Sequence, residues 1–416
     1  MDLSTILKFA FILGQVFWSS SEYLGTKDSP EVARLREYLR TESSHPTPNY
    51  EACIEWLHRQ ADDIGLVFNY EEYDKFKQNG SFAMWLTWLG RYPGLKSIIF
   101  DSHMDTVAVD PPKWVHPPFS AYKDENGRIF ARGASDMKPT TVATLEAIRS
   151  LKKAGYVPRR SIHVAIFPDE ELFNRGVKGF IKSGSFARLN VGFALDEGPG
   201  GSKDKIFISY VQKTRWQVKF IVRGPSTHTA AMPRSTTGEK LTFVLNKMMA
   251  FRASQFGLNS NETSSVNLVQ IGGGLATNVI PDELWAIFDL RLNSGMLPST
   301  ETFLRSVAAE SGNDTSIQFL QKDDEFSKSI VNDNSNIWWV AASKMCKKLN
   351  ATCTPINLAA VTDGRYFRNE GITVYGMGGA GGGGVHGHNE FISEDAYLQT
   401  IERYVLLLKT FSSVEE

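Results

Sequence analysis

The chain has 416 residues, more than one compact core usually holds, so we expect two cores. Hydrophobic residues make up 42% and charged residues 22%, a composition that excludes a largely disordered chain. Lys and Arg total 45 against 46 for Asp and Glu, so no excess positive charge favours nucleic acid or an anionic membrane, and we expect a small-molecule partner.

The first 21 residues differ from the rest of the chain. Residues 9–18 form an apolar run that is too short to span a bilayer, and serines follow it at residues 19–21. This pattern predicts a signal peptide over residues 1–21, no stable membrane span, and a protein that is secreted or lies in the secretory-pathway lumen. The alternative is an N-terminal amphipathic helix on a cytoplasmic protein. Sequons fit secretion but also arise by chance, and they stand at Asn79, Asn261, Asn313 and Asn350.

From about residue 97 the chain alternates between apolar runs and helical stretches. The runs cover residues 97–100, 162–167 and 191–195, and a helix is predicted over residues 138–154. Strands that alternate with helices indicate an α/β fold with a mostly parallel sheet. Apolar residues recur at every third position of the helix, which predicts one face packed on the sheet: Val142, Leu145, Ile148 and Leu151.

The alternation of strands and helices gives way to a different pattern between residues 206 and 318. A helix near residues 239–251 stands among short apolar strands, which predicts an inserted antiparallel sheet with helices; the strands are residues 206–210, 216–222, 266–271 and 284–290. The α/β pattern then returns with a helix near residues 335–349 and a strand at 372–375. Ser393 is expected to cap a last helix with apolar positions Leu398, Ile401, Val405 and Leu408. We therefore assign residues 22–205 and 319–416 to one domain and 206–318 to an insertion.

Three cysteines are too few for a disulfide scaffold, and an odd count leaves at least one without an intramolecular partner. They are Cys53, Cys346 and Cys353. A bridge between Cys346 and Cys353 is one option, and we favour buried free thiols.

Histidine and carboxylate side chains follow the predicted strands at the points where those strands end. His103 and Asp105 come directly after the first apolar run, and ligands bind at this edge of open α/β sheets. A lone His-x-Asp is more often a satisfied structural histidine near a strand end. Asp136 stands just ahead of the long helix, where it could instead be a helix cap.

Acidic residues follow two further apolar runs. Glu170 and Glu171 follow the run at residues 162–167, and adjacent like charges there cost stability unless a cation is present. A solvated acidic loop is the alternative. Glu197 follows the run at residues 191–195, and His386 precedes the last helix.

The combination of these five positions is more informative than any one of them. Imidazole together with carboxylate suits Zn²⁺, and would also accept Mn²⁺ or Co²⁺. Two such ions about 3.5 to 4 Å apart can together activate a water and polarise a carbonyl. An additional carboxylate is then needed as the general base, and the Glu170–Glu171 pair offers one ligand and one base.

Five segments resemble, in order, motifs of the aminoacylase branch of the two-zinc exopeptidase family, which also contains dipeptidases and deacetylases. They are residues 102–107, 131–138, 167–171, 194–198 and 278–281, and the likeness runs from about residue 30 to 412. The resemblance implies a zinc-exopeptidase catalytic domain over residues 22–205 and 319–416. The inserted α+β domain over residues 206–318 would be a dimerisation or lid domain.

The resemblance also implies roles for the site residues and two Zn²⁺ per subunit. His103, Asp136 and Glu197 would bind one zinc, and Asp136, Glu171 and His386 the other, with Asp136 as the bridge. Asp105 would orient His103, and Glu170 would be the general base. His386 is preferred to His388 because the ligand in the family lies four residues before a glutamate, here Glu390.

Further residues match substrate positions of the family. His228, in the segment of residues 224–228, would reach the active site of a partner subunit and stabilise the oxyanion, which implies a homodimer; otherwise it is a loop histidine. Asn278, Arg291 and Arg365 would bind or support the substrate, and a guanidinium suits a free α-carboxylate. Without the resemblance Arg291 is a sheet-surface residue.

Two departures from the family pattern concern the loops beside the metals. Residues 172–175 replace the usual glycine-rich continuation after Glu171, so the turn must differ. The stretch at residues 378–384 is unusually rich in glycine, which favours a mobile loop.

The implied function is hydrolysis of N-acyl-L-amino acids to a carboxylate and a free amino acid. The enzyme alternatives are a dipeptidase or carboxypeptidase, and a secreted hydrolase or synthase of long-chain N-acyl amino acids. The non-enzyme alternative is an inactive binding protein on the same scaffold.

Overall fold

The structure is a computed structural model that describes residues 28–73, 81–201, 204–259, 262–293, 295–324, 327–378 and 382–415. The predicted signal peptide at residues 1–21 and the sequons at Asn79 and Asn261 lie outside these ranges. Among the described helices, none is both long enough and apolar enough to cross a bilayer.

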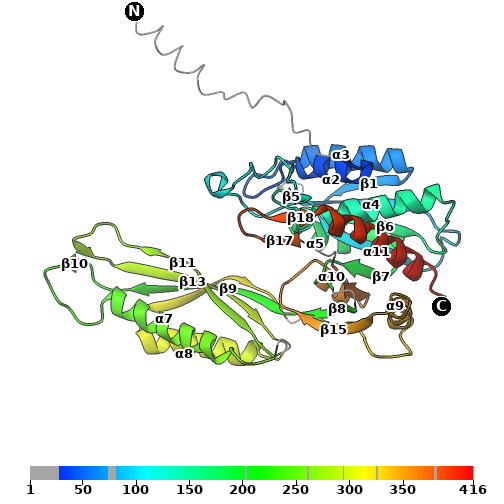
Figure 1. The fold of residues 1–416 in the computed structure, drawn as a ribbon. Coiled ribbons are helices and arrows are strands. Elements are labelled where there is room, and N and C mark those ends of the chain that lie inside the picture. Colours follow the sequence, from blue (N-terminus) through cyan, green and yellow to red (C-terminus); the bar gives the residue numbers. More distant parts are fainter. Residues whose placement is uncertain are drawn as a thin grey trace, which may run out of the picture.

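A large sheet is the centre of the fold (Figure 1). Within the described residues it has eight strands in the order β1 (Val67–Glu72), β2 (Phe82–Trp88), β6 (Ile162–Phe167), β3 (Ser97–His103), β7 (Val191–Asp196), β16 (Thr373–Gly376), β8 (Lys205–Gln212) and β15 (Thr352–Leu358). Strand β3 pairs in parallel with β6 and β7, and β7 does so with β16. The predicted α/β fold with a mostly parallel central sheet is confirmed, and β3 and β6 are buried along their whole length because helices cover both faces.

Two hydrophobic clusters separate this sheet from its helices. One face packs against α2 (Pro30–Leu39), α3 (Tyr50–Ile64), α4 (Lys138–Lys153), α9 (Ile337–Lys348) and α11 (Glu394–Ser412). The other face packs against α5 (Arg175–Ile181), α6 (Gly184–Leu189) and α10 (Gly364–Asn369). The stripe expected on α4 is buried, and Ser393 caps α11 by accepting from the Ala396 N–H at 3.2 Å.

A small four-stranded sheet lies beside the last helix. Its strands are β17 (Gly382–Gly383), β18 (Phe391–Ser393), β5 (Arg128–Phe130) and β4 (Tyr122–Lys123), and a short 3-10 helix, η1 (Pro111–Lys113), precedes it. This sheet joins the segment around His386 to the segment that leads into Asp136 and α4. Residues 379–381 of the glycine-rich stretch are outside the described residues.

The insertion forms a second antiparallel sheet that extends away from the large one (Figure 1). Its strands run in the order β11 (Ser265–Gly273), β13 (Glu283–Leu292), β9 (Thr214–Arg223) and β14 (Thr315–Lys322), and α7 (Thr237–Ser254) and α8 (Leu297–Ser311) pack on one face. Two short strands, β10 (Thr227–His228) and β12 (Val279–Ile280), pair at its tip. The expected antiparallel sheet with helices is therefore present.

The change from one sheet to the other falls a few residues after the expected bounds of 206 and 318. Strand β8 pairs in parallel with β15 of the large sheet, whereas β9 begins the small sheet at Thr214. At the other end β14 stays in the small sheet until Lys322. An apolar run predicts that β8 is a strand but carries no information about which strand it pairs with.

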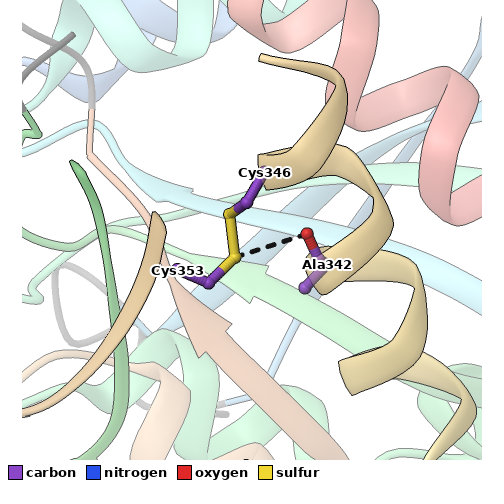
Figure 2. Close-up of a disulfide and its surroundings, with 3 residues drawn as sticks. All are labelled: Ala342, Cys346 and Cys353. Atoms are coloured by element: carbon purple, nitrogen blue, oxygen red, sulfur yellow. Dashed lines mark hydrogen bonds between the residues drawn. A yellow bond between two sulfur atoms is a disulfide. The ribbon is translucent and has the colours of Figure 1, made fainter. Parts of the chain in front are cut away.

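Cys346 and Cys353 form a disulfide with their Cα atoms 5.7 Å apart (Figure 2). Helix α9 ends just after Cys346, and the chain reverses at Asn350, which has φ of 52°, so that β15 returns beside the helix. The Sγ atom of Cys353 also lies 3.3 Å from the Ala342 carbonyl oxygen. The expectation of free thiols is wrong for this pair, because the reversal could not be read from spacing alone; Cys53 is free and buried, as expected.

Candidate metal centre

The five predicted metal ligands come from five separate segments that meet at one edge of the large sheet. His103 is the last residue of β3, Glu171 follows β6, and Glu197 follows β7. Asp136 directly precedes Met137, the N-cap residue of α4, which has no side-chain cap bond. His386 lies in the turn between β17 and β18.

Asp136 is the centre of the cluster. Its Oδ1 atom lies 3.0 Å from Nε2 of His103, and its Oδ2 atom lies 3.3 Å from Nε2 of His386. Nε2 of His386 is also 3.1 Å from Oε2 of Glu171. One carboxylate that faces two imidazoles through its two oxygens is the arrangement expected of a bridging ligand.

Ligand atoms of two overlapping groups converge within 4.8 Å of one another. The first group is His103, Asp136 and Glu171, and the second is His103, Glu170 and Glu197. All the predicted ligands and the predicted general base therefore lie in one cluster. A cavity of 320 Å³ opens beside Asp136 and Glu197.

The donor set fits a divalent cation. Oε1 of Glu171 is buried and has no hydrogen-bond partner among the described residues. Burial raises the pKa of Glu170 well above its usual value, and burial followed by the nearby Asp136 does the same for Glu197. A bound cation would offset both the burial and the mutual repulsion of these carboxylates, and imidazole with carboxylate suits Zn²⁺.

Asp105 anchors the turn that carries the two glutamates. Its Oδ1 accepts from the Glu170 N–H and its Oδ2 from the Glu171 N–H, both at 3.1 Å. Nδ1 of His103 is 2.9 Å from the Asp105 carbonyl oxygen and 3.4 Å from Oδ1. The predicted contact between Asp105 and His103 therefore exists, with the main-chain oxygen as the nearer atom.

His45 and Glu390 belong to the site, although the sequence did not identify a role for either. Nε2 of His45 is 2.9 Å from Oδ2 of Asp105. Although burial acts in the opposite direction, the contacts of Asp105 with His103 and His45 hold its pKa well below the usual range.

In the sequence, Glu390 was used only to choose His386 over His388. In the structure, its carboxylate accepts hydrogen bonds from the N–H groups of Ser135 and Asp136. The spacing of four residues between His386 and Glu390 was the only sign in the sequence that Glu390 belongs to the site.

Arg365 is fully buried, so its guanidinium does not face a substrate in this conformation. Its Nη2 donates to Oδ1 of Asn174 at 2.6 Å, and its Nη1 donates to the Thr362 carbonyl at 3.0 Å. Asn174 in turn donates to the Glu170 carbonyl at 2.9 Å. Arg365 thus braces the turn of the general base through Asn174.

The other predicted substrate residues lie in the insertion. Arg291 pairs with Asp289 through contacts of 2.7 and 3.3 Å and stands opposite Arg215 in the pairing of β13 with β9. Nη2 of Arg215 donates to the Leu172 carbonyl at 3.1 Å, within the turn that departs from the family pattern.

His228 and Asn278 lie together at the tip of the insertion. The Thr229 N–H donates to the Asn278 carbonyl at 3.2 Å, and His228 is exposed. Figure 1 shows β10, which ends at His228, at the end of the insertion that points away from the large sheet. Of the predicted site residues, these two are therefore not brought to the metal cluster within one chain.

Comparison with known proteins agrees with this geometry. Residues 99–410 match the model of a family described as Peptidase family M20/M25/M40. The chain belongs to this family. Among relatives of this M20 chain, Aminoacylase-1 of Mus musculus is 35% identical over 399 residues, which cover 93% of the chain and 96% of the mouse protein. Aminoacylase-1 of Homo sapiens is also 35% identical, with 93% and 97% covered.

A solved structure supports the fold. The crystal structure of human carnosine dipeptidase 1 superimposes with a TM-score of 0.74 at 14% identity, and the match covers 92% of this chain and 96% of that chain. At this identity the likeness concerns the fold alone. The resemblance stated from the motifs, an aminoacylase-branch member of the family, is confirmed by the sequence relatives.

Proposed function

We propose that the protein is a metal-dependent amidohydrolase that cleaves N-acyl-L-amino acids into a carboxylate and a free amino acid. One observation carries the proposal: His103, Asp136, Glu171 and His386 are joined by contacts of 3.0 to 3.3 Å at the ligand-binding edge of the sheet. That cluster occurs in a chain that aminoacylases match over 93% of its length. The similarity to aminoacylases supports the class of substrate, and the cluster of ligands supports metal-dependent hydrolysis.

The cluster has enough donors for two ions. His103, Asp136 and Glu197 would hold one, and Asp136, Glu171 and His386 the other, with Zn²⁺ as the preferred metal and Mn²⁺ or Co²⁺ as compatible ones. When bound, such ions would lower the pKa of a water and polarise the amide carbonyl.

Glu170 is proposed as the general base and acid. Its side chain is 7% exposed and belongs to the group formed with His103 and Glu197. The carboxylate takes a proton from the attacking water, whose oxygen bonds to the acyl carbon. Glu170 then delivers that proton to the amide nitrogen as the carbon–nitrogen bond breaks.

Recognition of the substrate carboxylate is proposed for Arg291 rather than for Arg365. The Arg291 side chain is 26% exposed, whereas Arg365 would have to leave Asn174 and Thr362 before it could bind a ligand. Asp289 holds the Arg291 guanidinium in place from one side, so its free edge can bind a carboxylate.

A homodimer is proposed to complete the site. Strand β11 is the edge of its sheet and carries exposed apolar side chains: Leu268 at 38%, Val269 at 51% and Ile271 at 55%. An exposed apolar edge strand pairs readily with a second chain. In such a dimer His228 would reach the partner's active site and stabilise negative charge on the carbonyl oxygen, together with Asn278.

Passage through the secretory pathway is a further proposal. The Cys346–Cys353 disulfide is typical of proteins from oxidising compartments. The described sequon asparagines, Asn313 and Asn350, are both exposed. Expression in cells that glycosylate secreted proteins should give a product in the medium whose mass falls on glycosidase treatment. An unglycosylated protein retained in the cytosol would contradict the proposal.

The function is tested by a paired assay on metal-analysed protein. The purified chain should contain about two zinc ions and hydrolyse N-acetyl-methionine faster than an unblocked dipeptide. A panel of acyl chain lengths would separate short-chain from long-chain N-acyl amino acids. Preference for the dipeptide would favour the dipeptidase alternative, and absence of metal with no hydrolysis would favour an inactive binding protein.

A further inference from the structure

Glu390 is a buried carboxylate at the centre of the turn that carries Asp136. Only 1% of the residue is exposed, and each of its oxygens accepts two hydrogen bonds. Oε1 accepts from the N–H groups of Ser135 and Asp136 at 2.7 and 3.0 Å. Oε2 accepts from the Gly133 N–H at 3.0 Å and from Nη1 of Arg132 at 2.7 Å. The carboxylate therefore fixes the main chain of the whole turn.

Arg132 balances the charge of this carboxylate. The arginine is 2% exposed, and its guanidinium lies 5.2 Å from the ring centre of Trp114. Its Nη2 also donates to the Ala108 carbonyl at 3.4 Å. A buried ion pair of this kind tolerates the loss of one partner poorly, because the remaining charge stays buried and uncompensated.

Glu390 and His386 link the same two segments of the chain. They are four residues apart in the segment between β17 and β18, and both contact Asp136, which is about 250 residues earlier in the chain. Glu390 binds the Asp136 main chain, whereas Nε2 of His386 approaches Oδ2 of the Asp136 side chain at 3.3 Å. Glu390 therefore links the segment that carries His386 to the turn that carries Asp136, although Glu390 is not itself in the ligand cluster.

We propose that Glu390, paired with Arg132, is a positioning residue that sets the affinity of the metal centre by fixing Asp136 against His386. The inference rests on the proposed metal site. Residues that orient metal ligands typically change metal affinity by about 10- to 100-fold when replaced. If the hydrogen bonds of Glu390 were weakened, every ligand would still be present, but the Asp136 carboxylate would occupy several positions.

Glu390→Gln tests this inference. The amide keeps the size of the side chain but presents its NH₂ group to one of the two pairs of donors, so at best half of the contacts survive. The matched control is Glu394→Gln, four residues later, whose carboxylate is 25% exposed and pairs with Lys123 at 3.0 Å. Zinc affinity is measured by competition with a chromophoric chelator at 25 °C, after circular dichroism shows that each variant is folded.

The expected result is zinc affinity weakened by about 10-fold or more in Glu390→Gln, and within two-fold of the parent in Glu394→Gln. A merely structural role would lower the unfolding temperature of the metal-free protein without changing affinity, and that outcome overturns the inference. If Glu390→Gln does not fold, Arg132→Lys is measured instead, and parental affinity in that variant overturns the inference. Weakened zinc binding in a protein that hydrolyses no N-acyl amino acid would leave this inference standing and refute the proposed function.

Discussion

Glu170 is the residue on which the proposed chemistry depends. Glu170→Ala should lower kcat on N-acetyl-methionine by at least about a thousand-fold, because neither the attacking water nor the leaving amine then has a proton carrier. Zinc content should stay at the parental level, since Glu171 and Glu197 remain. Glu125→Ala, at an exposed position, is the control. Residual activity above a thousandth of the parent would remove Glu170 from the mechanism.

His163 makes stability depend on pH independently of the metal centre. Burial lowers its pKa from the usual 6.5 to about 4, and its Nδ1 lies 2.9 Å from the Thr87 hydroxyl. Because the unfolded chain takes up the proton below pH 6.5 and the folded chain does not until about pH 4, the stability present above pH 6.5 is lost as the pH falls. The loss from this residue should be about 2 kcal/mol at pH 5.

The measurement for His163 is urea unfolding at pH 7.5 and at pH 5. His163→Gln cannot titrate, so it should lose about 2 kcal/mol less than the parent between the two pH values. Equal losses in the two proteins would show that His163 does not remain neutral in the fold.

The sequence identified the residues with ligand chemistry but not those that hold them. His103 and Glu171 follow apolar runs and Asp136 directly precedes a predicted helix, so local pattern and family motifs both point to them. His45 and Glu390 act through hydrogen bonds to residues about 60 and 250 positions away. Such pairings depend on how the segments pack in space, which spacing along the chain does not encode.

At the scale of elements, periodicity predicted helices well and strand partners poorly. Helix α4 has its predicted bounds to within one residue, because a three-residue apolar repeat specifies both the helix and its buried face. Strand β8 was also predicted as a strand, but its partner β15 lies more than 140 residues later. Which sheet a strand joins depends on contacts between residues far apart in the chain. The change of sheet therefore falls at Thr214 rather than at the expected residue 206.

The disulfide between α9 and β15 should stabilise the edge of the large sheet. Replacing both Cys346 and Cys353 by Ser should lower the free energy of unfolding by about 2 kcal/mol, the value expected for a closed loop of this length. Urea unfolding of the variant against the oxidised parent measures the difference. The parent treated with reductant should shift by a similar amount, and no shift in either sample would show that the bridge adds no stability.

At the scale of the whole molecule, the proposed dimer predicts that sites are shared. Ile271→Arg, on the exposed edge strand β11, should give a monomer with strongly reduced activity, because His228 then has no partner site to reach. Val115→Arg is the control, since Val115 is 77% exposed but lies outside the insertion. Light scattering gives the oligomeric state.

Mixing two inactive variants tests the sharing directly. His228→Ala and Glu170→Gln each disable every site of their own dimers. After subunit exchange, a mixed dimer should contain one site with an intact Glu170 and an intact partner His228, so activity should return. No recovery after proven exchange would place His228 outside the partner's site.

The hydrogen bond from Arg215 to the Leu172 carbonyl lies where the chain passes from the large sheet into the insertion. Leu172 directly follows Glu171, and Arg215 is the second residue of β9. A displacement of β9 against the large sheet would therefore act on the turn that carries Glu170. The placement of the insertion and the placement of the proposed proton carrier are thus linked through this hydrogen bond.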